Sequence, residues 1–179
     1  MKIGILSDTH DHLENLARAM QILNARGVGL VLHLGDWVAP FVPLFLVKTA
    51  PEPLRCPLKG IFGNNDGDHF LFLRVLASQQ LDVEIEKTVL SLEQDGRKLL
   101  CYHGTEPPIT EALVACGQYD AVFSGHTHGA LVRRVGATLH VNPGSLAGIR
   151  GGLPGGPATF ALYDTTTNDA EILDLSTAQ

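Results

Sequence analysis

The chain has 179 residues, enough for one domain, because a single hydrophobic core can grow to roughly 250–300 residues. Hydrophobic residues make up 45% of the sequence and charged residues 18%, which excludes a disordered chain and a coiled coil. The net charge of −6 disfavours a general nucleic-acid binder, since such proteins carry an excess of Lys and Arg. We therefore expect one folded domain over residues 1–179.

The cysteines and the apolar runs predict a cytoplasmic protein. Cys56, Cys101 and Cys116 form no Cys-x-x-Cys pair, and their odd number excludes a closed disulfide framework. Reduced thiols are typical of the cytosol. The longest apolar run, residues 41–47, contains a proline and is much shorter than the ~20 residues that a membrane-spanning helix needs. The apolar run at residues 3–6 is too short for a signal peptide.

The first part of the chain predicts an α/β arrangement. Asp11 and Glu14 form a capping-box pattern at the start of a predicted helix. That helix lies between two apolar strands, which predicts a parallel pair with a right-handed crossover. The elements expected up to residue 79 are strands at 2–7, 29–34 and 54–62, helices at 11–26 and 66–79, and a short helix within 40–53.

The remainder of the chain predicts mostly short strands. The Asp95-Gly96 pair is a strong hairpin signal. Residues 144–157 are rich in Gly and Pro, which indicates either an ordered turn or a mobile surface loop. The expected elements are a helix at 109–116 and strands at 83–85, 89–93, 98–102, 121–123, 131–135, 138–141, 159–163 and 170–173.

Residues with metal-binding side chains follow five of these strands. In open α/β sheets, ligands bind just beyond the carboxyl ends of strands. Side chains two apart in an extended segment point the same way, so Asp-x-His and His-x-His each offer two donors. The five strand ends are Asp8-Thr9-His10, Gly35-Asp36, Gly63-Asn64-Asn65-Asp66, His103-Gly104 and Gly125-His126-Thr127-His128-Gly129.

These donors predict a site for two divalent metal ions. Carboxylate oxygens and imidazole nitrogens without a thiolate suit Mn, Fe, Ni or Zn. The donors outnumber the ligands of one tetrahedral ion, which favours a pair of ions. Each short motif alone also has an ordinary explanation as a turn or a helix cap. The conjunction of all five in one chain favours the metal site.

The five blocks, in this order, resemble the calcineurin-like metallophosphoesterases, whose pattern is Asp-x-His, Gly-Asp, Gly-Asn-His-Asp/Glu, His and Gly-His-x-His. The resemblance continues through Asn142-Pro143-Gly144-Ser145, Arg150-Gly151-Gly152 and Phe160-Ala161-Leu162-Tyr163-Asp164. Those later features and the small size are similar to the YfcE-type phosphodiesterase branch. The resemblance implies an α/β (α+β) fold, a two-sheet β-sandwich flanked by helices.

The resemblance also implies which residues hold the metals. One ion would be bound by Asp8, His10, Asp36 and His128. The other would be bound by Asn64, His103 and His126, with Asp36 shared between the two. Manganese is the first expectation, with Fe, Ni or Zn as alternatives. A water or hydroxide between the ions would attack the phosphorus of a small phosphoester in line.

The sequence departs from the family pattern at Asn65, where many members have a His that assists the leaving group. An Asn side chain cannot donate a proton as an acid does. We take Asn65 and Asp66 as catalytic candidates, with Asp66 either orienting Asn65 or His103 or capping the following helix. Asn64, His12 and Arg150 are candidates for substrate contact. A solvated helix-end His and a surface Arg are the alternatives for the last two.

The function expected from these residues is metal-dependent hydrolysis of a small phosphodiester or other phosphoester. One alternative is a protein-interaction scaffold on the same fold with weak or no catalysis. A further alternative is a nucleotide or cyclic-nucleotide hydrolase, since the −6 charge argues against long nucleic acid only. Because members of this family often form homo-oligomers, self-association is also expected, and a membrane partner is not.

Overall fold

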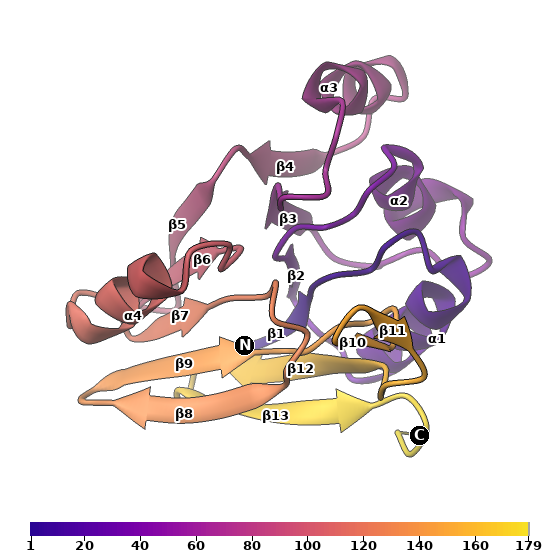
Figure 1. Cartoon of the computed structure of the whole chain (residues 1–179). Coiled ribbons are helices and arrows are strands. Elements are labelled where there is room, and N and C mark those ends of the chain that lie inside the picture. Colours follow the sequence, from indigo (N-terminus) through magenta and orange to yellow (C-terminus); the bar gives the residue numbers. More distant parts are fainter. Residues whose placement is uncertain (179) are drawn as a thin grey trace.

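Two β-sheets packed face to face form the body of the structure, a computed structural model that describes residues 1–178 (Figure 1). The six-stranded sheet has the order β13-β12-β1-β2-β3-β4. Strands β1 to β4 run parallel, β12 pairs antiparallel with β1, and the edge strand β13 pairs antiparallel with β12. The bounds are β1 (Lys2–Leu6), β2 (Leu30–His33), β3 (Leu58–Ile61), β4 (Val83–Glu86), β12 (Thr159–Asp164) and β13 (Asp169–Asp174).

The five-stranded sheet has the order β5-β6-β7-β9-β8. Asp95 (φ 53°) and Gly96 (φ 77°) join β5 to β6 with two left-handed residues, which confirms the predicted hairpin. Strands β6, β7 and β9 run parallel, and β5 and β8 are antiparallel edges. The bounds are β5 (Val89–Gln94), β6 (Arg97–Tyr102), β7 (Ala121–Phe123), β8 (Leu131–Val135) and β9 (Thr138–Asn142).

Helices cover the outer faces of the two sheets (Figure 1). Helix α1 connects β1 to the parallel β2, which confirms the predicted parallel pair, and α4 packs on the five-stranded sheet. None of the helices in residues 1–178 combines the length and apolar character that a membrane crossing requires. The bounds are α1 (Leu13–Ala25), α2 (Phe41–Leu44), a π-helical turn (Phe45–Thr49), α3 (His69–Ser78) and α4 (Pro107–Ala115).

Alternating side chains of β1 serve two hydrophobic layers. Ile3 and Ile5 point between the sheets, where they pack in one cluster with Phe123 of β7. Leu6 belongs to a second cluster that includes Leu16 and other residues of α1. A strand buried on both faces reads as a continuous apolar run, which is why β1 has no polar side chain from Ile3 to Leu6. The predicted two-sheet sandwich flanked by helices is confirmed.

Asp11, the predicted cap of the first helix, does not cap it, and neither does Asp66, for which a cap is one of the alternatives. Both carboxylates bind the loop after β2 instead. Helix α1 is capped by His12, while Asp11 Oδ1 accepts a hydrogen bond from the Ala39 amide at 2.9 Å. Helix α3 is capped by Asp68, because the Asp66 carboxylate is engaged by three amides of the site described below.

The Gly- and Pro-rich segment 144–157 is an ordered turn. It contains a small hairpin of β10 (Ile149–Arg150) and β11 (Leu153–Pro154). Its start is tied to β1, since the amides of Leu146 and Ala147 donate to the carbonyls of Ser7 and Asp8. The segment therefore covers the end of β1, where the first metal-binding motif begins.

Candidate metal centre

Four of the predicted ligands converge at the carboxyl ends of the strands. Asp8, His10, Asp36 and His128 each bring one ligand atom within 4.8 Å of the others. Nε2 of His10 lies 3.3 Å from Nε2 of His128 and 3.7 Å from Oδ2 of Asp36. Nε2 of His128 lies 3.2 Å from Oδ1 of Asp8. Two oxygen and two nitrogen atoms thus surround one point, an arrangement that suits a divalent cation.

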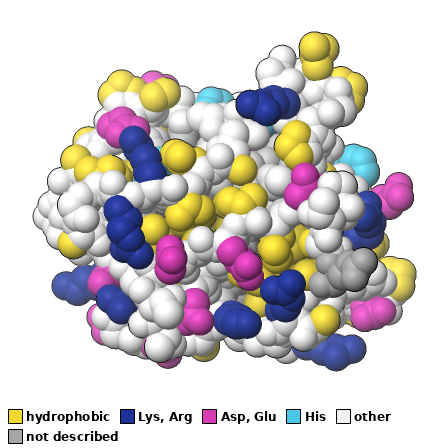
Figure 2. All heavy atoms as spheres, turned by 90° about the horizontal axis from the view of Figure 1, so that it is seen from below, with side chains coloured by type: hydrophobic (Ala, Val, Ile, Leu, Met, Phe, Trp, Pro, Cys, Tyr) yellow, Lys and Arg dark blue, Asp and Glu magenta, His cyan; other side chains and the backbone are white. Residues whose placement is uncertain are grey.

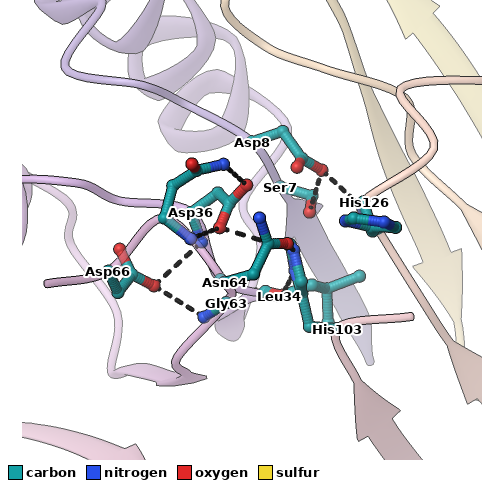
Figure 3. A network of polar contacts seen from close by, with 12 residues as sticks. Ser7, Asp8, Leu34, Asp36, Gly63, Asn64, Asp66, His103 and His126 are labelled. Atoms are coloured by element: carbon teal, nitrogen blue, oxygen red, sulfur yellow. Dashed lines mark hydrogen bonds and ion pairs between the residues drawn. The ribbon is translucent and has the colours of Figure 1, made fainter. Parts of the chain in front are cut away.

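The Asp8 carboxylate is buried and half satisfied. Its Oδ2 accepts hydrogen bonds from Ser7 Oγ (2.5 Å) and from the His126 amide (3.0 Å), as Figure 3 shows. Its Oδ1 has no hydrogen-bond partner among residues 1–178. A buried carboxylate oxygen without a partner is costly unless a cation compensates it. The unpartnered atom faces the other three ligands, so these residues fit a bound metal ion.

Backbone carbonyls fix which nitrogen of two histidines is free. Nδ1 of His128 lies 3.0 Å from the Ile149 carbonyl, and Nδ1 of His103 lies 2.7 Å from the Leu34 carbonyl. Because a carbonyl only accepts, each Nδ1 carries the proton and donates it. In the neutral imidazole, each Nε2 then turns a lone pair toward the cluster, the usual arrangement for an imidazole that binds a metal.

A second group of predicted ligands lies on the other side of Asp36 (Figure 3). Nε2 of His103 is 3.1 Å from Asn64 Oδ1 and 3.4 Å from Asp36 Oδ1. The rings of His103 and His126 meet edge to face, with centroids 5.3 Å apart. Asp36 thus presents Oδ2 to the first group and Oδ1 to the second. The structure brings all seven predicted ligands into one region.

Hydrogen bonding keeps the central carboxylate ionised. Burial by itself raises the pKa of Asp36, but hydrogen bonds from His103 and from the amide and side chain of Asn65 outweigh it, and the pKa is well below its ordinary value. Burial lowers the pKa of His103, but the carboxylates of Asp36 and Asp8 raise it by more. The adjacent Asp8 carboxylate raises the pKa of His128. The site therefore attracts positive charge, as protons on imidazole or as a metal ion.

The ligands do not lie on extended backbone, which corrects the expectation from side-chain alternation. Left-handed φ angles occur at five of the seven, namely Asp8 (52°), His10 (41°), Asp36 (58°), His126 (64°) and His128 (57°). This conformation is uncommon outside glycine and costs energy at each position. Tight left-handed turns after the strands, rather than pleated strand geometry, direct both donors of the Asp-x-His and His-x-His motifs toward the site. Such strain gathered at one place is typical of a functional site.

Two glycines allow the strand ends to approach each other. A Cβ atom on Gly35, whose φ is 100°, would lie 2.5 Å from the Gly63 amide nitrogen. A Cβ atom on Gly63 would lie 2.6 Å from the amide nitrogen of Asp36 and 2.8 Å from Cε1 of His103. Because real Cβ contacts are longer than this, only glycine permits the spacing that brings Asp36 beside His103.

The two catalytic candidates both support the turn that carries Asp36. The Asn65 amide and Nδ2 donate to Asp36 Oδ1 (2.8 Å) and Oδ2 (2.7 Å). Asp66 Oδ2 accepts from the amides of Asp36 (2.9 Å) and Gly63 (2.7 Å), and its Oδ1 accepts from the Val38 amide (2.8 Å). Asp66 thus orients backbone rather than Asn65 or His103. It also holds Val38 at a φ of 76°, which is strained for a β-branched residue.

Two of the substrate-binding candidates lie outside this cluster. His12 is exposed, and its Nδ1 accepts from the Asn15 amide at 3.3 Å. Arg150 is exposed on β10, next to Ile149, whose carbonyl orients His128. Within residues 1–178, neither side chain forms a hydrogen bond or ion pair with the seven ligands.

Sequence reasoning missed several supporting residues. Ser7 fixes Oδ2 of Asp8, and Ser145 Oγ donates to the Asp8 carbonyl at 2.9 Å. Asn142 Nδ2 donates to the Gly125 carbonyl at 2.8 Å and so supports the loop before His126. Asn142 and Ser145 belong to the Asn-Pro-Gly-Ser block at 142–145, which is part of the resemblance to the family. No pattern in the sequence indicates which groups these two side chains bind.

Comparisons with known proteins agree with the geometry. A family model described as calcineurin-like phosphoesterase superfamily domain matches residues 1–168. Phosphodiesterase MJ0936 of Methanocaldococcus jannaschii is 37% identical over 168 residues, covering 92% of this chain and 93% of that protein. The solved structure of an archaeal phosphodiesterase has a TM-score of 0.83 and 34% identity, covering 97% of this chain and 99% of that one.

A further solved structure shares the fold at lower identity. The phosphoesterase YfcE from E. coli has a TM-score of 0.68 and 24% identity, covering 92% of this chain and 89% of that one. These matches confirm the resemblance that the five strand-end motifs predicted.

Proposed function

Because the chain belongs to the calcineurin-like phosphoesterase superfamily, we propose that it hydrolyses a small phosphodiester with divalent metal ions held at the strand-end cluster. The 37% identical relative carries the name phosphodiesterase, which supports a diester rather than a monoester. The observation that carries the proposal is the buried, unpartnered Oδ1 of Asp8, which faces His10, His128 and Asp36.

The proposed ligand sets follow the two groups of side chains. The first ion is bound by Asp8, His10, Asp36 and His128, whose ligand atoms already converge. The second ion is bound by the other face of Asp36 together with Asn64, His103 and His126. Manganese is the first choice, with Fe, Ni or Zn as alternatives, because nitrogen and oxygen donors without sulfur suit these ions.

The protein's own residues prepare this site for an anionic substrate. Bound divalent ions lower the pKa of coordinated water and neutralise charge on phosphoryl oxygens. The carbonyls of Ile149 and Leu34 hold His128 and His103 with Nε2 facing inward. The Asn65 amide and side chain hold the two oxygens of Asp36, and a carboxamide does not act as an acid toward a leaving group. We therefore expect a preference for esters whose leaving group needs no protonation.

The charge on the surface supports a small substrate rather than long nucleic acid. On the face shown in Figure 2, Lys and Arg side chains are interspersed with Asp and Glu and form no single basic stripe. A net charge of −6 points the same way, whereas divalent ions would make the site itself attractive to phosphate. A single domain over residues 1–179, a cytoplasmic location and self-association remain predictions.

The test measures metal content and hydrolysis together. Chelator-treated protein is reloaded separately with Mn, Fe, Ni or Zn, and hydrolysis of bis(4-nitrophenyl) phosphate is followed. We expect activity with at least one ion and none after chelation. The variant Asp36→Asn should lose both metal and activity by at least tenfold. The matched control Asp82→Asn, which changes an exposed carboxylate outside the site, should behave as the unaltered protein.

A metal-replete protein that turns over no phosphodiester, phosphomonoester or cyclic nucleotide would contradict the proposal. A stable partner whose binding survives Asp36→Asn would then favour the scaffold interpretation.

A further inference from the structure

A cleft of about 300 Å³ lies beside the second group of proposed ligands. Its lining includes Asn64 and His103 together with Phe62, His69, Lys87 and Tyr102. The volume is that of roughly ten water molecules, enough for a small organic group. A phosphodiester whose phosphate lies at the metal centre has two ester groups, and one of them would reach this cleft.

Lys87 reaches the cleft from the point where the chain passes between the sheets. Lys87 and Thr88 form the whole connection between β4 of one sheet and β5 of the other (Figure 1). The Lys87 side chain is exposed and forms no ion pair within the described part of the chain. Its ammonium is therefore available to a ligand.

The charge of this cleft differs from that of its neighbours. Its lining contains Lys87 and no carboxylate. Four other clefts on the described surface each contain at least one acid, namely Glu111, Asp82, Asp164 and Glu86, and the cleft with Glu86 adjoins this one and shares Lys87 with it. In a chain of net charge −6, a cationic cleft without acids favours a negatively charged ligand group.

The aromatic walls use their polar atoms elsewhere. His69 stacks on Phe62 with centroids 4.0 Å apart, and its Nε2 lies 3.0 Å from the Asp66 carbonyl, to which it donates. The Tyr102 hydroxyl accepts from the Glu106 amide at 3.2 Å. These residues leave mainly ring surface for the cleft. The cleft thus combines an apolar wall with one cation.

We propose that this cleft binds one ester group of the substrate and that Lys87 selects an ester group carrying a carboxylate or a further phosphate. The inference rests on the proposed function, since the phosphate has to occupy the metal centre for its ester group to enter the cleft. An exposed ammonium–anion pair changes affinity by up to about fivefold. The expected selectivity is of that size.

The test compares two diesters that differ only in charge. One is 4-nitrophenyl 3-carboxyphenyl phosphate and the other is its neutral 3-carbamoylphenyl analogue. We expect kcat/KM to be about fivefold higher for the carboxylate ester at low salt, with the difference shrinking at high salt. Lys87→Gln should abolish the difference by lowering kcat/KM for the carboxylate ester about fivefold relative to the neutral ester. The control Lys48→Gln, an exposed lysine of another cleft, should retain the difference.

Equal kcat/KM for the two esters in the unaltered protein would overturn the inference, as would an equal loss for both esters in Lys87→Gln. If the metal-loaded protein hydrolyses neither ester, calorimetric titration with each ester replaces the kinetic readout. Tighter binding of the carboxylate ester that Lys87→Gln removes would then support the cleft while contradicting the proposed hydrolysis. Equal binding would overturn the cleft as well.

Discussion

Nε2 of His128 lies 3.2 Å from Oδ1 of Asp8, and the two residues follow strands of different sheets. Asp8 comes after β1 of the six-stranded sheet, and His128 comes after β7 of the five-stranded sheet. The site therefore exists only where the sheets are packed against each other. A metal ion between these two atoms would also link the sheets, so metal binding and folding stability should be coupled.

Ser7→Ala should weaken metal binding without unfolding the protein. The Ser7 hydroxyl holds Oδ2 of Asp8 at 2.5 Å, and loss of such a supporting hydrogen bond typically reduces metal affinity by about tenfold or more. Calorimetric titration with Mn²⁺ measures the affinity. Ser91→Ala, at an exposed position of β5, is the matched control. Unchanged affinity in Ser7→Ala would show that Asp8 needs no such support.

Gly63→Ala should destroy the site, whereas Gly67→Ala should be harmless. The added Cβ at position 63 would clash with the Asp36 amide nitrogen at 2.6 Å, and backbone cannot move aside cheaply. At position 67 an added Cβ meets nothing within 4 Å. We expect more than tenfold weaker metal binding for Gly63→Ala and unchanged metal binding for Gly67→Ala. Equal metal affinities in the two variants would contradict the packing described here.

Asp66→Ala should lower the free energy of unfolding by about 3 kcal/mol, because it leaves three backbone amides without their acceptor. Asp68→Ala, which removes only the cap of α3, should cost about 1 kcal/mol. Urea unfolding of both variants measures the difference. A smaller loss in Asp66→Ala than in Asp68→Ala would mean that water replaces the carboxylate.

Stability should fall in mild acid partly because of His140. Burial and the nearby Arg133 lower the pKa of His140 to about 4, against a smaller opposing effect of Glu111. Between the ordinary pKa near 6.5 and about 4, the unfolded chain therefore binds a proton that the folded protein does not. Stability from this group is complete above pH 6.5 and declines as the pH falls toward 4.

The variant His140→Gln isolates that contribution. In chelator-treated protein, its urea midpoint should change less between pH 7 and pH 5 than that of the unaltered protein. His12→Gln, at an exposed helix cap, should keep the original pH dependence. If the urea midpoint of His140→Gln changes with pH as much as that of the unaltered protein, groups other than His140 cause the loss of stability in acid.

The sequence predicts which metal-binding residues follow each strand, but it does not predict the backbone conformation of the turns that carry them. Glycine-flanked donors after apolar runs predict that Asp8, Asp36 and His126 gather at one edge, because parallel strands end together. The left-handed φ angles at these residues depend on tertiary contacts, such as the three amides that meet at Asp66. Local propensity disfavours that conformation, so no local pattern could predict it.

The absence of a cap at Asp11 and at Asp66 has the same origin. Asp11 and Asp66 each precede a helix, which is the pattern of an N-cap. In the folded protein each carboxylate instead binds the loop after β2, which is distant in sequence. The backbone carbonyls of Leu34 and Ile149, which orient His103 and His128, belong to residues distant in sequence. No side-chain pattern in the sequence indicates such contacts.

An anomalous difference map from crystals grown with saturating Mn²⁺ tests the central claim most directly. We predict one peak within coordination distance of Asp8 Oδ1, His10 Nε2, Asp36 Oδ2 and His128 Nε2. A second peak should lie between the other oxygen of Asp36 and the side chains of Asn64, His103 and His126. A map without a peak at this cluster, or with manganese bound only elsewhere, would contradict the proposed metal centre.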